Sequence, residues 1–229
     1  MATIISHPET HSEEMRRPVV LRSLAIDSAI LLRDPVFIGL TLIGGFGLGG
    51  FMVFLANGAF VYSNVFGLGP TAFSLAFPAN APAVFAASQG AARLLFALGA
   101  GRLIGLETAG FALCILAPLG LERFLGLPLA GLILGLFLAN TFLGLLLPVA
   151  MVLSLDAHGT RAGRAASMSG AVQMCAGSTM VAIAGSVFDG TTPPMLAAIA
   201  LCAVLTAITA RMTLPHLFLL HTKEAPSAP

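Results

Sequence analysis

Six long apolar segments fill most of the chain between Val36 and Met212 and decide what it can fold into. A helix needs about 20 apolar residues to cross the hydrocarbon core of a bilayer. Because backbone groups in lipid must bond to one another, spanning segments are either helices or strands of closed barrels. Barrel strands would alternate over roughly ten residues, whereas residues 125–155 are continuously apolar. The sequence therefore predicts an all-α membrane protein with six transmembrane helices.

The composition supports a membrane protein and argues against a soluble domain. Of 229 residues, 57% are hydrophobic and 9% are charged, whereas soluble domains are about 45–50% apolar and about 25% charged. A formal net charge of +1 gives no indication of a nucleic-acid partner. The three cysteines lie in separate apolar segments without the paired spacing of a disulfide or zinc site, so we expect buried thiols, no metal and no cofactor. They are Cys114, Cys175 and Cys202.

The chain divides into two tails and one membrane domain. Residues 1–34 are predicted to be a polar tail followed by an interfacial helix at 19–33, which is too short and too charged to span. Residues 214–229 are predicted to be a second tail. The domain at 35–213 contains the predicted spans, at about 36–62, 72–92, 103–121, 127–155, 165–188 and 194–213.

The basic residues predict the orientation of these spans. When the N-terminus is placed on one side of the membrane, that side receives ten of the eleven Lys and Arg residues, all except Arg123. Basic residues accumulate on the cytoplasmic side of membrane proteins. Both tails are therefore predicted to be cytoplasmic.

Prolines and glycines predict how the spans bend and associate. Pro78 and Pro82 in the second span and Pro148 in the fourth remove backbone donors, so kinks are expected there. Such broken helices often line a cavity in transporters. Two small-xxx-small pairs, which let helices approach closely, are formed by Gly45 with Gly49 and by Gly131 with Gly135.

Four neutral amides lie within the apolar segments: Asn57, Asn80, Asn140 and Gln173. An amide in hydrocarbon needs a hydrogen-bond partner, so these side chains are expected to face the interior of the bundle. They are candidates to line a substrate cavity. The alternative is that they bond one helix to another.

Glu107 lies about one turn into the third predicted span, five residues after Arg102. A charge inside the membrane costs several kcal/mol unless it is paired, which makes Glu107 a candidate for proton coupling. The alternative is a residue near the cytoplasmic interface that either snorkels to the interface or pairs with Arg102. Between the two, we expect the interfacial role.

Two long stretches carry a family resemblance. One is residues 73–105, and the other is residues 142–173, which includes an HGxRAG loop at 158–163 that begins ten residues after Pro148. They resemble the C-terminal half of Bcr/CflA-type drug-resistance transporters of the major facilitator superfamily. The similarity extends over about residues 15–213 and includes LLRDPVFIG before the first span and FDG at 188–190.

The resemblance implies one half of a twelve-helix transporter, with a three-plus-three repeat and with substrate bound between two halves near the bilayer midplane. It implies multidrug or small-molecule efflux, in which small amphipathic molecules are exchanged for protons by alternating access in a bacterial inner membrane. The bilayer, a separate N-terminal half or a second copy would then be partners. The alternative is a truncated, non-transporting remnant of such a transporter.

The matching loop also provides candidate gating residues. They are Asp34, His158, Gly159, Arg161 and Gly163. In this interpretation Arg161 pairs with Asp34 or Asp156 across the cytoplasmic gate. The alternative is that Arg161 is an anchor near the lipid headgroups.

An integral membrane enzyme acting on lipid is the remaining class. It would need His, Asp, Glu or Cys clustered at one membrane depth. The chain has no phosphate-binding loop, so a transporter of this kind would use no ATP. The five histidines are scattered over tails and one loop. We therefore expect no enzyme activity. The histidines are His7, His11, His158, His216 and His221.

Overall fold

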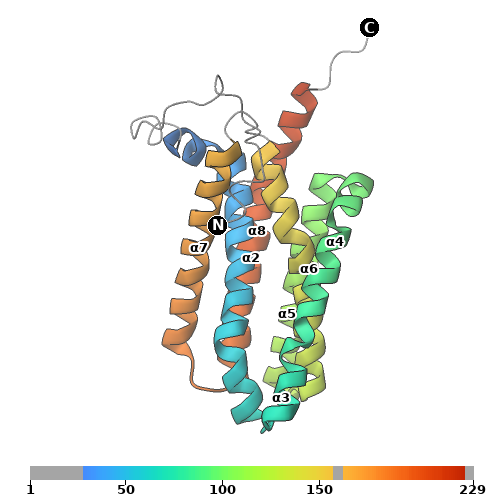
Figure 1. Ribbon diagram of the computed structural model, residues 1–229, viewed down its shortest axis with the longest axis vertical. Helices are drawn as coiled ribbons and strands as arrows, with labels where there is room; N and C mark the ends of the chain where they lie inside the picture. Colours follow the sequence, from blue (N-terminus) through green and yellow to red (C-terminus); the bar gives the residue numbers. More distant parts are fainter. Residues whose placement is uncertain (1–27, 157–161, 225–229) are drawn as a thin grey trace, which may run out of the picture.

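The computed structural model describes residues 28–156 and 162–224, with side chains as far as Leu217. The described residues are helical almost throughout and contain no strand. Residues 28–33 are helical and run across the end of the bundle, at an angle to the first long helix (Figure 1). The elements that follow are α2 (Pro35–Phe60), the π-helical turn η3 (Val61–Val65), α3 (Pro70–Ala76), the 3-10 turn η4 (Pro78–Asn80), α4 (Ala81–Leu98), α5 (Ala100–Leu125), α6 (Leu129–Asp156), α7 (Ala162–Val187) and α8 (Thr192–Glu224).

Six helical segments are long and apolar enough to cross a bilayer. This confirms the predicted fold class, and the arrangement is consistent with half of a major facilitator transporter. The segments are Pro35–Val65, Pro70–Leu98, Ala100–Leu125, Leu129–Asp156, Ala162–Val187 and Thr192–Leu217.

The last helix is longer than the sequence suggested. The predicted sixth span ends at 213, but α8 continues to Glu224 and contains Pro215. The reason is packing, because Leu217 is buried and Leu214 packs against the core. Much of the predicted C-terminal tail is therefore helix.

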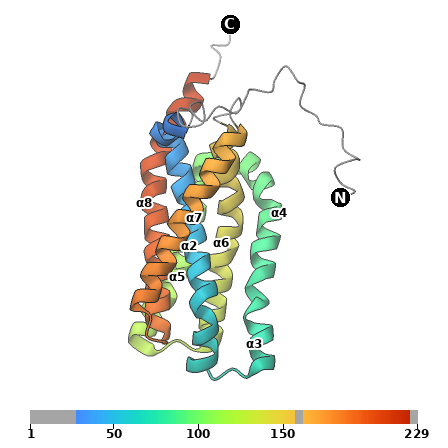
Figure 2. The ribbon, with the colours of Figure 1, turned by 60° about the vertical axis from the view of Figure 1, so that its left-hand side comes forward.

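Helix α2 occupies the middle of the bundle (Figure 1) and packs against α6, α7 and α8. Helix α5 packs between α6 and α8, and α4 packs against α6. Successive spans run in opposite directions, so both ends of the described chain lie at the same end of the bundle (Figures 1 and 2).

Glycines allow α2 and α7 to approach closely. A Cβ on Gly45 would lie 3.3 Å from the Cα of Gln173, and a Cβ on Gly49 would lie 3.5 Å from the Cα of Gly177. In the second predicted pair, Gly131 with Gly135, the close helix contact is at Gly135. A Cβ there would lie 2.5 Å from the ring of Pro118 on α5. Without a hydrophobic driving force in lipid, van der Waals contact at this range is a main source of helix association.

The second span is broken where prolines predicted a kink. The α-helix stops before Pro78, a 3-10 turn follows, and α4 begins at Ala81. Figure 2 shows α3 and α4 following each other along one column. Pro82 stands in the first turn of α4, where its missing N–H has no intrahelical partner in any case. Helix α6, in contrast, continues through Pro148.

Tight turns connect the helices. Gly99 and Gly126 end α4 and α5 with φ of 76° and 74°, a backbone conformation that glycine adopts without steric cost. Between α7 and α8, Asp189 accepts hydrogen bonds from the hydroxyl of Thr191 at 2.5 Å and from its N–H at 2.9 Å. These bonds hold the pKa of Asp189 below its usual range.

The variant Gly144→Ala tests the contact between α6 and α4. A Cβ on Gly144 would lie 2.5 Å from the carbonyl oxygen of Val84 and 2.8 Å from its Cα, so the two backbones would have to separate. We expect a loss of about 1–3 kcal/mol, seen as a lower midpoint of thermal unfolding in detergent. Gly170→Ala on α7 is the matched control, because nothing lies within 4 Å of that Cβ position. Equal losses in both variants would contradict this packing.

Candidate functional site

A buried polar cluster joins the break in the second span to the middle of α6. The Nδ2 of Asn140 donates to the Oδ1 of Asn80 at 3.1 Å, and these side chains are 3% and 2% exposed. Tyr62 is fully buried, and its hydroxyl approaches the Asn80 amide without forming a well-aligned hydrogen bond. Among the described residues, the Tyr62 hydroxyl and the Asn80 Nδ2 therefore have no hydrogen-bond partner.

Irregular backbone positions two members of this cluster. Tyr62 lies in the π-helical turn η3, and Asn80 ends the 3-10 turn that follows Pro78. Short π-helical insertions and 3-10 turns within long helices often mark functional sites. A buried polar group without a partner costs about 1–3 kcal/mol, so the open donors of this cluster are suited to a ligand or to water.

Aromatic side chains form an apolar wall beside the cluster. The rings of Phe54 and Phe77 are stacked with centroids 5.1 Å apart, and those of Phe73 and Phe77 are 5.2 Å apart. Tyr62 meets Phe77 edge-on at 6.1 Å. Aromatic surface next to a few hydrogen-bonding groups is the usual composition of a small-molecule site.

The sequence analysis missed Tyr62. It is the only tyrosine in a chain that has no tryptophan, and it lies at the end of the first predicted span. Its rarity was the signal that could have pointed to it.

The other two predicted amides lie outside this cluster. The Nδ2 of Asn57 donates to the Val53 carbonyl within α2 at 3.1 Å. The Nε2 of Gln173 donates to the Ser169 hydroxyl on α7 at 3.1 Å, and that hydroxyl also receives a hydrogen bond from Thr41 on α2 at 3.3 Å. Of the four candidates, the structure brings together Asn80 and Asn140.

Glu107 is fully buried, and neither of its carboxylate oxygens has a hydrogen-bond partner in the described part of the chain. The expected interfacial role is wrong in both forms. Glu107 is buried and does not snorkel, and it does not face Arg102 because residues five apart point about 140° away from each other around a helix. Arg102 is exposed. One turn further along α5, the ring of Phe111 lies 3.0 Å from a Cβ position on Gly50 of α2. This face of α5 is therefore turned toward the bundle interior.

The gating candidates are only partly described. Asp34 caps α2, where its Oδ1 accepts from the N–H of Val36 at 2.8 Å and of Phe37 at 3.3 Å. Such a cap stabilises a helix by about 1 kcal/mol. Gly163 lies exposed in the first turn of α7. The remaining candidates, His158, Gly159 and Arg161, lie outside the described residues.

The cysteines are less buried than we expected. Cys202 is buried and Cys114 is half-buried, but Cys175 is exposed on α7, and all three are free thiols. The reason for the exposed Cys175 is that α7 packs mainly against α2, which leaves its other face on the outside of the bundle. Within residues 28–156 and 162–217, no three His, Cys, Asp or Glu side chains gather in a way that could hold a metal.

Six bilayer-length helices make this chain a multi-pass membrane protein, and two curated proteins are similar to it. It is 28% identical over 202 residues to the uncharacterized MFS-type transporter YdgK of Bacillus subtilis, covering 87% of this chain and 49% of that protein. It is 27% identical over 206 residues to a bicyclomycin resistance protein homolog of Haemophilus influenzae, covering 88% of this chain and 50% of that protein. No family model and no solved structure matches.

These similarities confirm the predicted resemblance to Bcr/CflA-type drug-resistance transporters. The chain spans about half the length of the curated relatives it matches, which is consistent with a C-terminal half. Both relatives carry names of transport or resistance proteins, and neither name is that of an enzyme.

A double-mutant cycle tests the amide pair. Asn80→Ala, Asn140→Ala and the double variant are expected to give a coupling energy of about 0.6 kcal/mol and at most about 1.7 kcal/mol, the average and the maximum for hydrogen bonds between membrane helices. The measurement is the free energy of unfolding in mixed micelles. The same cycle between Asn57 and Asn140 is the control, because Asn57 bonds to its own helix. Equal coupling in both cycles would show that the pair is not specific.

Proposed function

We propose that this chain is half of a secondary transporter that exports small amphipathic molecules by proton-coupled alternating access. Its similarity to an MFS-type transporter and to a bicyclomycin resistance protein homolog supports the class. The observation that carries the proposal is the cluster of Tyr62, Asn80 and Asn140 beside stacked phenylalanines. An amphipathic molecule would place an acceptor group against the open donors and its apolar part against the rings.

The exposed faces of α4 and α7 support the proposal that this chain packs against a second unit. In the most apolar part of their spans, 11% and 17% of the residues are buried, against 39–67% in the other four. They are also the two least apolar spans, although a helix surrounded by lipid should be strongly apolar. We infer that these faces meet a second six-helix unit or a water-filled pathway between two units.

The partner would be a separate N-terminal half or a second copy of the chain. The two halves of such transporters are parallel repeats, related by an axis along the membrane normal. A second copy has the same basic residues and would therefore enter the membrane in the same orientation. This geometry is compatible with either partner.

The distribution of charge supports cytoplasmic termini in the bacterial cytoplasmic membrane. The end of the bundle at which both ends of the described chain lie also carries most of the described basic residues, and Arg123 lies at the opposite end. Positive charge marks the cytoplasmic side. The basic residues at that end are Arg33, Arg93, Arg102, Arg164 and Arg211.

Glu107 is the group that we propose to carry the coupling proton. A carboxylate charge at this buried position would cost several kcal/mol without a partner. Helix α8 packs against α5, and neither carboxylate oxygen of Glu107 has a hydrogen-bond partner in the described part of the chain. Release of the proton would therefore require a conformation that opens the contact of α5 with α8, which is the kind of step that alternating access provides.

Transport by reconstituted vesicles tests the proposed function. The chain is incorporated alone, and also together with the remaining half of the Bacillus subtilis relative, and movement of a fluorescent lipophilic cation is followed under an imposed pH gradient. We expect gradient-driven movement in at least one of the two preparations. No movement in either, from protein that is folded and inserted, would instead support the non-transporting remnant.

Glu107→Gln tests the proton site in whichever preparation transports. This change keeps the shape of the side chain but removes its titration, so gradient-driven transport is expected to fall to the background level. Exchange of substrate without a gradient should continue. Glu122→Gln is the control, because that carboxylate lies in the last turn of α5 and accepts from the N–H of Leu127 at 2.6 Å. Unchanged coupling in Glu107→Gln would rule out this role.

A further inference from the structure

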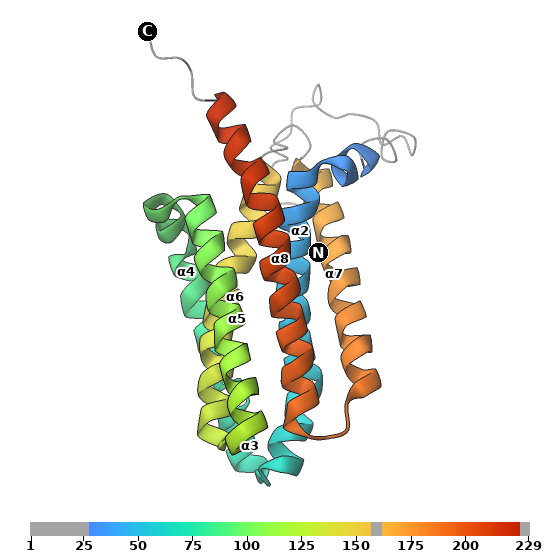
Figure 3. The same cartoon turned by 180° about the vertical axis from the view of Figure 1, so that it is seen from behind.

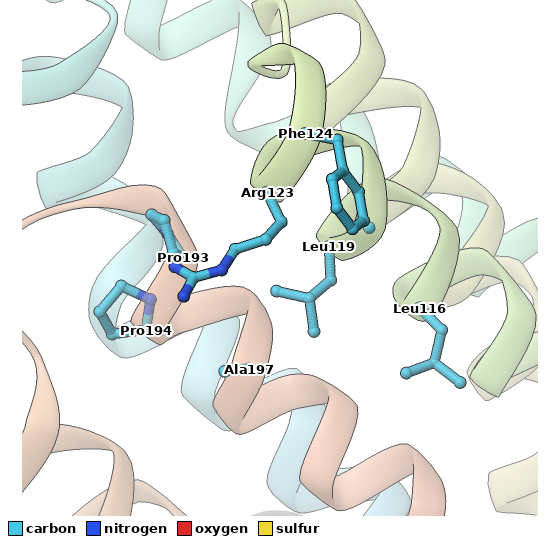
Figure 4. A pocket seen from close by; sticks show the side chains of 8 residues that line it. Leu116, Leu119, Arg123, Phe124, Pro193, Pro194 and Ala197 are labelled. Atoms are coloured by element: carbon cyan, nitrogen blue, oxygen red, sulfur yellow. The ribbon is translucent and has the colours of Figure 1, made fainter.

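A pocket opens on the outside of the bundle at the end opposite Arg33 and Arg211, between the last turns of α5 and the first two turns of α8 (Figure 4). These two helices lie side by side along the bundle (Figure 3). The pocket has a volume of about 550 Å³. It is lined by Leu116, Leu119, Gly120, Arg123, Phe124, Pro193, Pro194 and Ala197.

The pocket combines an apolar wall with one cation. Figure 4 shows the Arg123 side chain extended from α5 toward Pro193 and Pro194. In residues 28–156 and 162–217, Arg123 makes no ion pair or hydrogen bond. The neighbouring carboxylate of Glu122 is occupied by the N–H of Leu127 at 2.6 Å. The guanidinium is therefore available to an anion from outside the chain.

We propose that this pocket binds an anionic phospholipid, with its phosphate on Arg123 and an acyl chain along Leu116, Leu119 and Ala197. A guanidinium offers a planar set of donors that binds phosphate with two parallel hydrogen bonds. The prolines at the start of α8 have no N–H to offer. The headgroup contact is therefore assigned to Arg123.

The position of Arg123 in the membrane favours a lipid over a free anion. The third span ends at Leu125, so Arg123 lies at the edge of the bilayer, where lipid phosphates are found. Leu116 is seven residues earlier and therefore about 10 Å deeper along the helix. A headgroup at Arg123 thus has its acyl chain directed along the apolar wall, whereas a free phosphate would leave that wall without a contact.

Native mass spectrometry of the full chain tests the proposal. The chain is purified in detergent and exchanged into micelles that contain either phosphatidylglycerol or phosphatidylcholine. We expect one phosphatidylglycerol retained per chain and little phosphatidylcholine. A hydrogen-bonded charge pair is worth about 1.5–3 kcal/mol, so Arg123→Gln should weaken retention of phosphatidylglycerol by at least about tenfold.

Two further variants separate charge from shape. Ala197→Phe should block the acyl chain and lower retention although Arg123 is unchanged, and Arg123→Lys should keep part of the binding. Arg93→Gln removes an exposed arginine at the other end of the bundle and is expected to leave retention unchanged. Thermal unfolding shows whether each variant is folded.

Three results would overturn the proposal. One is equal retention of the two lipids, and another is unchanged retention in folded Arg123→Gln. The third is a second copy of the chain in place of lipid, with a dimer that Ala197→Phe dissociates. The test needs no transport activity, so its outcome is independent of the proposed function.

Discussion

Close backbone contact around α2 is the constraint on which the rest of this bundle depends. Lipid supplies no hydrophobic force between helices, so the bundle is held by van der Waals contact and by a few interhelical hydrogen bonds. Gly45 and Gly49 bring α7 against α2, and the Thr41 hydroxyl adds a hydrogen bond to Ser169 at the same interface. With α2 enclosed by α6, α7 and α8, its far end can depart from regular helix and carry Tyr62 into the interior.

The candidate site depends on where a bundle in lipid can place polar backbone groups. A lipid-embedded bundle tolerates irregular backbone only where it is buried in protein or lines a cavity. Here η3 and η4 are the irregular segments, and they bring Tyr62 and Asn80 to the amide of Asn140. Glu107 lies apart from this cluster on α5. Substrate recognition and proton coupling would then occupy different helices and require a shared movement.

Apolar length predicted the six spans, and Pro78 predicted the break in the second one, because both are local properties of the chain. The Asn80–Asn140 pair joins residues 60 positions apart and depends on how α4 packs against α6, so sequence spacing could not predict it. The pairing of Glu107 with Arg102 failed for a geometric reason that a helical projection would have exposed. The extension of α8 depends on burial of Leu217, which is not visible from the sequence around Pro215.

The central place of α2 has a consequence for biogenesis. It is the first of the six spans to be synthesised, but three of the helices that enclose it, α6, α7 and α8, are the last three. The glycine-rich surface of α2 therefore stays without these three neighbours, in the bilayer or beside the insertion machinery, until α6, α7 and α8 have been synthesised. The same delay applies to α5, which packs against α8. Assembly of this bundle is thus a late event that follows insertion.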